Sequence, residues 1–326
     1  MTSVDLADLE VKEEEKETTA SLIRGVLAKL HKAGYPVAGF DMYVTSTVLP
    51  GSGLSSSAAC EVLIGTTGNH LFCQDKFDAV EIAKIGQAAE NEYFGKPCGL
   101  MDQTASSVGD AVAIDFKDPA NPIVRSINAD LTGLGLALCI IDCGADHAAL
   151  TNEYASIPEE MSKVAAHFGK KVLREVQEED LLADLAQVRK EAGDRAVLRA
   201  LHFYADDRRA AEEADALERK DKEAFLNLVK ESGRSSWELL QNITPAAAIT
   251  HQDMAVALAV AEKALNGKGA CRVHGGGFAG TIQAFVPVED VCEFKKTMET
   301  MLSEGCCHVL SIRPAGGLIL LRMRGK

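Results

Sequence analysis

A carboxylate, Asp102, ends a short loop in the first third of the chain. Gly95, Pro97 and Gly99 fix the loop, and a helix is predicted over residues 102–108. A carboxylate in such a place can orient or deprotonate an attacking hydroxyl group. It can also serve as an N-cap, the commonest use of Asp at a helix start. The local sequence leaves both interpretations open.

Glu90 and Ser57 supply oxygens of the kind that a magnesium ion accepts. Glu90 lies in the helix predicted over residues 78–93, and Ser57 opens an earlier helix. Mg²⁺ takes few protein ligands together with phosphate oxygens and water, so one carboxylate and one hydroxyl can be enough. The alternative for Glu90 is an ordinary surface position on its helix.

Residues 50–59, PGSGLSSSAA, form a glycine-serine loop that runs into the helix opened by Ser57. Gly51 and Gly53 permit backbone angles closed to other residues and let a ligand approach the main chain. The serines add hydroxyl groups and successive N–H groups at a helix start, which favours anions. The pattern predicts a phosphate cradle, although it lacks the lysine of the GxxxxGK[ST] loop. A serine-capped helix after a tight turn is the alternative.

The elements that carry these residues alternate between helix and strand in the first half of the chain. The pattern becomes mainly helical after about residue 143, which predicts domains of residues 1–143 and 144–326. A glycine cluster, His274 to Gly280, is predicted to turn between two strands and by itself indicates only a hairpin. The other predicted elements are helices over residues 21–33 and 289–303 and strands over residues 40–49, 111–116, 136–142, 307–312 and 317–321.

Composition limits the possible functions. A net charge of −14 excludes a typical nucleic-acid binder but not an ATP site, because backbone N–H groups can hold phosphates in an acidic protein. The chain has no apolar run long enough for a membrane span and no basic-then-apolar leader. Nine cysteines without CxxC spacing and eight histidines without ligand spacing predict thiols in a reducing cytoplasm and no zinc site.

The glycine-serine loop, the loop that ends at Asp102 and the late glycine cluster together resemble, in order and spacing, the GHMP kinase superfamily. The segment Cys98 to Gln103, CGLMDQ, is similar to its galactokinase branch, as is the segment Thr151 to Tyr154, TNEY. The resemblance covers about residues 20 to 320. It implies a two-domain α/β (α+β) fold with a ribosomal-protein-S5-like N-terminal half and a ferredoxin-like C-terminal half.

The resemblance also implies a role for each matching residue. Asp102 would act at the sugar hydroxyl, Ser57 and Glu90 would hold Mg²⁺, and Gly99 and Tyr154 would contact the sugar together with Asp102. The glycines of the late cluster would support the active site from the second domain. The residues that would wrap the ATP phosphates are Gly51, Ser52, Gly53, Leu54, Ser55, Ser56, Ser57 and Ala58, and the supporting glycines are Gly275, Gly276 and Gly277.

Two departures from the family pattern bear on activity. Residues 1–40 hold no Gly-Glu-His-x-Asp signature and no accompanying arginine segment, so a sugar-binding segment is expected to be missing upstream. His274 and Ala279 stand where the family has threonine and glycine. Phosphoryl transfer depends on positioning and charge neutralisation, so a lost pocket wall could abolish activity without unfolding the rest.

The expected function is ATP-dependent phosphorylation of galactose by a cytoplasmic monomer that needs Mg²⁺ and binds neither nucleic acid nor membrane. One alternative is a non-catalytic, galactokinase-like protein that binds the ligand and regulates a partner. Another is a related kinase for N-acetylgalactosamine or arabinose. The retained Asp102, Glu90 and Ser57 favour catalysis, whereas the absent arginine segment favours the regulator.

Overall fold

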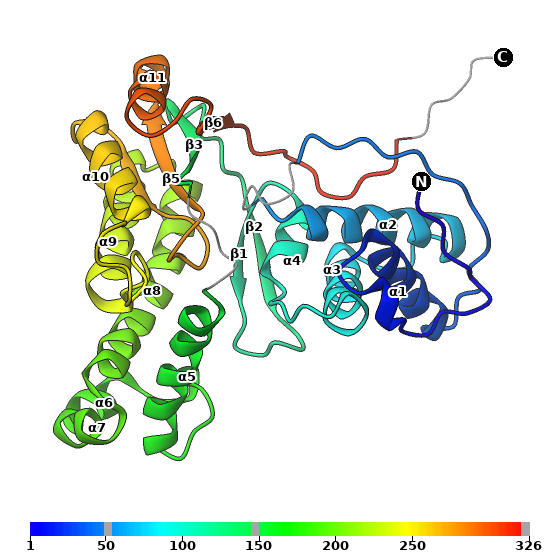
Figure 1. The fold of residues 1–326 in the computed structure, drawn as a ribbon, viewed down its shortest axis with the longest axis horizontal. Coiled ribbons are helices and arrows are strands. Elements are labelled where there is room, and N and C mark those ends of the chain that lie inside the picture. Colours follow the sequence, from blue (N-terminus) through cyan, green and yellow to red (C-terminus); the bar gives the residue numbers. More distant parts are fainter. Residues whose placement is uncertain (49–53, 145–149, 321–326) are drawn as a thin grey trace. The chain divides into compact units, whose positions relative to one another are not determined.

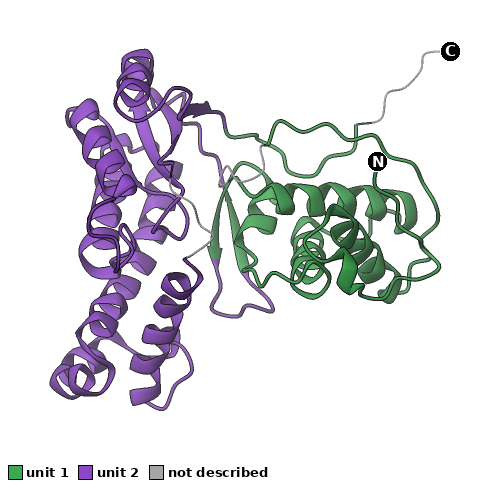
Figure 2. Ribbon diagram, viewed as in Figure 1, with its two compact units in different colours: residues 1–114, 123–126, 312–326 green, residues 115–122, 127–311 purple. Residues whose placement is uncertain are grey.

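The computed structural model describes residues 1–48, 54–144 and 150–320. The chain divides into two compact units, shown in different colours in Figure 2. Unit 1 consists of residues 1–114, 123–126 and 312–326, and unit 2 of residues 115–122 and 127–311. This division into compact units assigns residues 127–143 to unit 2. The domain boundary at residue 143 stays a prediction.

Unit 1 is mainly helical. Figure 1 shows its helices α1 to α4, of which α3 continues directly into a π-helical turn, η2. A short strand pair, β1 and β2, follows them in the chain. The bounds are η1 Glu13–Glu15, α1 Thr19–Lys32, α2 Ser56–Phe72, α3 Ala79–Ala89, η2 Glu90–Phe94, α4 Met101–Val108, β1 Ala111–Asp115 and β2 Ile123–Ile127.

The core of unit 1 lies where α1, α2 and α3 meet. Val26, Leu30 and Ile64 are at most 2% exposed and form one apolar cluster with Ala89 at the end of α3. Gly25 allows α1 and α3 to approach closely, because a Cβ atom there would lie 2.8 Å from the Ala89 Cβ atom. This packing places the end of α3, and hence η2, at a fixed distance from α2.

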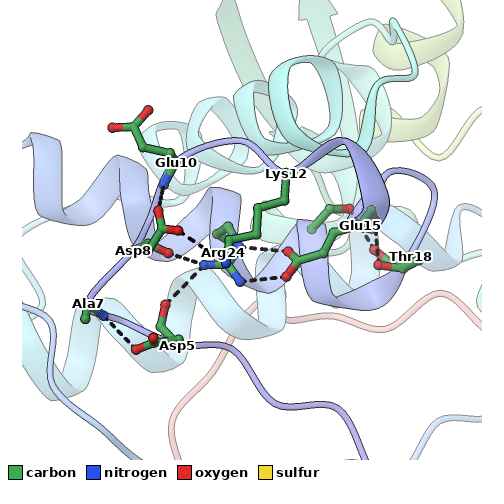
Figure 3. Close-up of polar contacts among 9 residues, drawn as sticks. Asp5, Ala7, Asp8, Glu10, Lys12, Glu15, Thr18 and Arg24 are labelled. Carbon is green, nitrogen blue, oxygen red and sulfur yellow. Dashed lines mark hydrogen bonds and ion pairs between the residues drawn. The ribbon is translucent and has the colours of Figure 1, made fainter.

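The N-terminal segment is attached to α1 through one buried arginine, Arg24, which is 2% exposed (Figure 3). Its guanidinium donates two hydrogen bonds to the Glu15 carboxylate, at 2.6 and 2.7 Å. It also donates to the main-chain carbonyls of Asp5 and Asp8. The guanidinium beside Glu15 lowers the pKa of that carboxyl. Arg24 thus ties the polar, acidic start of the chain to the helical core.

Unit 2 contains a four-stranded antiparallel sheet in the order β4-β5-β3-β6, of which Figure 1 labels β3, β5 and β6. The central pair β3–β5 aligns Leu136 with Pro287 and Asp142 with Thr281. Apolar side chains of the sheet pack with α10 and α11 in one buried cluster. The bounds are β3 Leu136–Asp142, β4 Ala270–Val273, β5 Thr281–Pro287, β6 Cys307–Leu310, α10 Asp253–Leu265, η5 Val288–Asp290 and α11 Val291–Met301.

The remaining helices of unit 2 form a second core of their own. Leu181, Val188 and Ala200 are completely buried in it. Helix α9 connects this part to the sheet, since Phe225 meets Phe285 of β5 edge to face at 4.8 Å. The bounds are α5 Thr151–His167, η3 Leu173–Glu175, α6 Glu178–Ala183, α7 Leu185–Ala192, α8 Asp194–Glu218, α9 Lys222–Ser235 and η4 Ser236–Leu240.

Two predicted strands are wrong within the described residues. Residues 40–48 form no strand: Tyr43 is 91% exposed, and no described segment offers it a backbone hydrogen-bonding partner. Residues 317–320 are also without a strand, and the Gly317 N–H instead donates to the Ser107 carbonyl. Alternating β-branched residues favour an extended backbone. A β-strand nevertheless forms only where a neighbouring strand provides the partners for its backbone hydrogen bonds.

The other predicted elements lie within a few residues of the observed ones. None of the helices in the described parts of the chain combines the length and the apolar character that a bilayer-spanning segment requires.

Candidate active site

Asp102 is the second residue of α4, and Leu100, not Asp102, is the N-cap of that helix. The N-cap alternative for Asp102 is therefore wrong. Its exposed side chain accepts a hydrogen bond from the Ser55 hydroxyl. A carboxylate in the first turn of a helix is stabilised by the helix dipole. The residue thus presents an anchored carboxylate to solvent, as a general base for a hydroxyl substrate requires.

Ser57 and Glu90 lie together in the structure. The Ser57 hydroxyl, in the first turn of α2, donates to the Glu90 carboxylate at 3.1 Å. Glu90 is only 4% exposed, so the surface-residue alternative is wrong. A hydroxyl and a carboxylate oxygen this close can share one hard cation such as Mg²⁺. The pair therefore fits the predicted metal site.

Two residues that the sequence analysis did not single out complete this cluster. Glu61 of α2 is completely buried, and Gln103 of α4 is 1% exposed. The Gln103 amide donates to Glu61 at 3.0 Å and to Glu90 at 2.8 Å. Two signals in the sequence could have indicated them: Glu61 lies one helical turn after Ser57, on the same face, and Gln103 directly follows Asp102.

The cluster has no compensating positive charge, since neither Glu61 nor Glu90 forms an ion pair with a basic side chain among the described residues. Burial, followed by the charge of Glu90, raises the pKa of Glu61 to about 8. Burial likewise raises the pKa of the nearby Cys98 thiol to about 12, and the Glu90 charge adds to it. Such an environment favours a bound cation or a proton.

Part of the glycine-serine loop is visible where it enters α2. Ser55 has left-handed backbone angles, φ 54° and ψ 61°, and makes no side-chain cap with the helix, because its hydroxyl donates to Asp102. The serine-cap alternative is thus wrong for Ser55. The first N–H groups of α2, at Ser56, Ser57 and Ala58, have no side-chain cap and lie where a helix favours anions. Gly51, Ser52 and Gly53 lie outside the described residues.

Gly99, a predicted sugar contact, leaves room beside the carboxylate loop. It is exposed, and a Cβ atom there would meet no atom within 4 Å. Two hydrogen bonds to Cys98 hold the loop in place. The Asn91 side-chain oxygen accepts from the Cys98 N–H at 2.7 Å, and the Gln87 amide donates to the Cys98 carbonyl at 3.2 Å. A ligand can therefore approach the main chain at Gly99 while the loop remains in place.

In unit 2, Tyr154 meets the late glycine cluster. Its hydroxyl donates to the Gly277 carbonyl at 2.9 Å, and its ring lies edge to face with Phe278 at 5.6 Å. The cluster forms the turn between β4 and β5, as predicted. Gly277 has a φ of 84°, and a Cβ atom there would lie 2.1 Å from the Asn242 carbonyl oxygen. Only glycine fits this position, so the turn is a rigid support for the Tyr154 ring.

The predicted site residues thus form two groups, one in each unit. Unit 1 brings together Ser55, Ser57, Glu90 and Asp102, and unit 2 brings Tyr154 against the glycine turn.

Comparison with known proteins defines the class of protein first. Residues 21–110 match the GHMP kinases N terminal domain. The crystal structure of Lactococcus lactis galactokinase complexed with galactose has the same fold, with a TM-score of 0.76 over 97% of this chain and 80% of that one, at 23% identity. A mevalonate kinase structure is similar at a TM-score of 0.54 and 16% identity, over 91% of this chain and 76% of that one. The α/β fold of GHMP kinase type is therefore confirmed.

Curated relatives then narrow the class. The galactokinase of Streptomyces coelicolor is 33% identical over 275 residues, which are 84% of this chain and 68% of that protein. The galactokinase of Actinobacillus pleuropneumoniae serotype 3 is also 33% identical over 275 residues, with 83% and 68% covered. The chain belongs to the galactokinase family, and thus to the sugar kinases that use ATP as phosphate donor.

Proposed function

We propose that the protein phosphorylates galactose at the expense of ATP and gives galactose 1-phosphate. The observation that carries the proposal is the arrangement in unit 1, where a hydroxyl–carboxylate pair, Ser57 and Glu90, adjoins an anchored carboxylate, Asp102. Phosphoryl transfer needs these two things: oxygens that hold a phosphate-bound cation and a base that positions the attacking hydroxyl. Membership of the galactokinase family makes galactose the first sugar to test.

The residues from Gly51 to Ala58 would hold the ATP phosphates through the main-chain N–H groups at the start of α2. Ser57 and Glu90 would hold Mg²⁺, which supplies positive charge to the phosphate oxygens as they react. Asp102 would accept the proton of the sugar hydroxyl, and its hydrogen bond from Ser55 keeps its carboxylate in one orientation. The hydrogen bonds between Ser57 and Glu90 and between Ser55 and Asp102 support the metal and base roles.

The sugar would contact Gly99, Asp102 and Tyr154. Open space at Gly99 supports this role, as a hydroxyl-rich ligand can reach the main chain there. Gly275, Gly276 and Gly277 would support Tyr154 through its hydrogen bond to the turn. All nine cysteines are free thiols, which supports a reducing compartment such as the cytoplasm. A monomeric state stays a prediction.

The experiment measures ADP release and sugar phosphate formation with galactose, N-acetylgalactosamine and arabinose in parallel. Since the aligned part spans 68% of the Streptomyces coelicolor relative, it is run on residues 1–326 and on the product of the complete reading frame. Galactose should give the highest kcat/KM, and omission of Mg²⁺ should abolish turnover. Tight ATP or galactose binding without turnover in either form would contradict the proposal and favour the regulator.

A further inference from the structure

We propose that Glu61 is a positioning residue, which orients the Gln103 amide and through it fixes the Glu90 carboxylate against Ser57. This inference rests on the proposed function in that Glu90 is taken to hold the metal ion. It assigns a role to the one completely buried carboxyl group of the cluster, which the family motifs in the sequence did not explain.

Glu90 itself needs support from neighbouring side chains. It is the first residue of the π-helical turn η2, where the regular ladder of α3 has ended. Its carboxylate is held from both sides: the Ser57 hydroxyl donates to Oε1 at 3.1 Å, and the Gln103 amide donates to Oε2 at 2.8 Å. If either donor turned away, the carboxylate could rotate about its last side-chain bond.

The Gln103 amide is held in turn by Glu61. An amide nitrogen carries two protons, and here one goes to Glu90 and the other to Glu61, at 3.0 Å. The Gln103 carbonyl oxygen has no partner in the described structure, so its two N–H donors define which way the amide points. Without Glu61, only the bond to Glu90 and a long contact to the Cys98 sulfur, at 3.5 Å, would remain.

Glu61 has no room to leave this position. At Gly86 of α3, a Cβ atom would lie 3.0 Å from the Glu61 Cβ atom and 3.1 Å from its Oε2 atom. Helix α3 therefore covers the side chain closely, and this approach is possible because residue 86 is glycine. The bond from Gln103 to Glu61 thus couples α2, α3 and α4 at the place where the metal ligands lie.

A purely structural role would not need a carboxyl group. Burying a carboxyl beside a second carboxyl is costly, and the Glu61 Oε1 atom has no hydrogen-bonding partner in the described structure. A leucine of similar volume would avoid that cost. Direct metal binding is assigned to Glu90 and not to Glu61, since Glu61 is completely buried and the Ser57 hydroxyl donates to Glu90. Orientation of the liganding carboxylate is the remaining role.

The test compares Glu61→Leu, Glu61→Gln, Gln103→Leu and the double variant Glu61→Leu/Gln103→Leu. Titration calorimetry measures the affinity for adenylyl imidodiphosphate, a non-hydrolysable ATP analogue, over a series of MgCl₂ concentrations. Loss of a residue that orients a metal ligand typically weakens metal binding about 10- to 100-fold. We expect Glu61→Leu to raise the half-saturating Mg²⁺ concentration about tenfold while affinity for the metal-free analogue stays near wild type.

Two comparisons show that the effect passes through Gln103. Glu61→Gln keeps a side-chain oxygen as acceptor at the same place and should restore most of the Mg²⁺ affinity. The double variant should be little worse than either single leucine variant, since residues that act as one unit are not additive. Additive losses, or an equally large loss in Glu61→Gln, would overturn the proposal.

A stability control separates positioning from general destabilisation. Asp78→Ala removes the capping box at the opposite end of α3, which should cost about 1 kcal/mol of stability without touching the cluster. It should leave the Mg²⁺ midpoint unchanged. If Glu61→Leu lowers the thermal midpoint and leaves the Mg²⁺ midpoint unchanged, Glu61 is structural and the proposal is wrong.

Ser57→Ala and Glu90→Gln distinguish failure of this inference from failure of the proposed function. If both shift the Mg²⁺ midpoint and Glu61→Leu does not, only the positioning role is refuted. If neither shifts it, the metal assignment itself is wrong. Should Glu61→Leu fail to fold, Glu61→Met takes its place, because it also removes the acceptor on residue 61 and leaves the direct bond from Gln103 to Glu90.

Discussion

The two units compensate the charge of partly or fully buried carboxylates in opposite ways. In unit 2, Glu160 is joined to Arg195 at 2.5 Å and to Arg199 at 2.9 Å, and Arg199 is completely buried. Although burial opposes ionisation, the bond from Arg195 and the charge of Arg199 lower the pKa of Glu160. In unit 1, Glu61 and Glu90 share a neutral amide donor, and no basic side chain pairs with them among the described residues.

We interpret the ion-paired Glu160 of unit 2 as structural, and Glu61 and Glu90 of unit 1 as part of a ligand site. A partly buried carboxylate that is paired with guanidinium groups needs nothing further, and its partners hold helices together. Two buried carboxyls that share only an amide cannot both ionise without cost, and a proton or a cation would reduce that cost. We therefore expect the carboxyl cluster of unit 1 to bind a cation, at some expense of its own stability.

The largest effect is expected at the exposed end of the unit 1 site. Asp102→Asn keeps the size of the side chain and the bond from Ser55 but removes the base, for which losses of about 10²- to 10⁴-fold in kcat are typical. The measurement is galactose 1-phosphate formation by the complete reading frame. Asp41→Asn, on an exposed residue of the same unit, is the control. Full activity in Asp102→Asn would show that the carboxylate has no catalytic role.

In unit 2 the corresponding loss should be one of stability. Glu160→Leu leaves the completely buried Arg199 without its carboxylate, which typically costs about 3–5 kcal/mol. Urea denaturation followed by circular dichroism measures the change. An exposed ion pair, Arg189 with Asp194, provides the matched control: Asp194→Leu should cost no more than about 1 kcal/mol. Equal losses would mean that burial does not distinguish the two pairs.

Glu90→Gln should separate stability from function in unit 1. The change removes a buried carboxylate that no basic side chain pairs with among the described residues, so the free energy of unfolding without Mg²⁺ should stay the same or rise by up to about 1 kcal/mol. The Mg²⁺ concentration needed for turnover should increase, because an amide oxygen is a weaker ligand for Mg²⁺ than a carboxylate. An unchanged Mg²⁺ midpoint would mean that Glu90 has a structural role and does not bind the metal ion.

The sequence predicted the helices that carry Ser57, Glu90 and Asp102 better than it predicted the conformation of residues 40–48. The helices that carry Ser57, Glu90 and Asp102 have local signals: apolar periodicity, a serine-rich start and a glycine-bounded loop. Strand pairing between segments far apart in the sequence has no such local signal. The sequence therefore predicted a strand at residues 40–48, which the structure does not contain.

The buried partners were missed for a similar reason. In the sequence, Glu61 and Gln103 look like ordinary polar residues on helices. In the structure both are buried, and α3 packs closely against them at Gly86. Glu160 and Arg199 are 39 positions apart in the chain, and their pairing likewise depends on contact between α5 and α8. Charge can be counted from a sequence, but whether it is compensated depends on tertiary packing.

An effect that depends on pH is expected at Glu213 of α8, a carboxyl of unit 2 that forms no ion pair with a described residue. Its Oε1 atom is buried without a partner, and burial raises its pKa from 4.5 to about 7, although Arg272 and Arg209 oppose the shift and Asp206 adds to it. Between these two values the folded state keeps a proton that the unfolded state has released. The contribution of Glu213 to the free energy of unfolding therefore falls as the pH rises from 4.5 to about 7, and then levels off.

Glu213→Gln is neutral at every pH, so its stability relative to wild type should increase through the same window, by an amount on the order of 2 kcal/mol. Urea denaturation across that pH range measures the difference. Glu212→Gln, at the exposed neighbouring position, should run parallel to wild type. A difference that stays constant with pH would mean that Glu213 is ionised in the folded protein. In that case the guanidinium groups of Arg272 and Arg209 would compensate its charge as fully as Arg195 and Arg199 compensate that of Glu160.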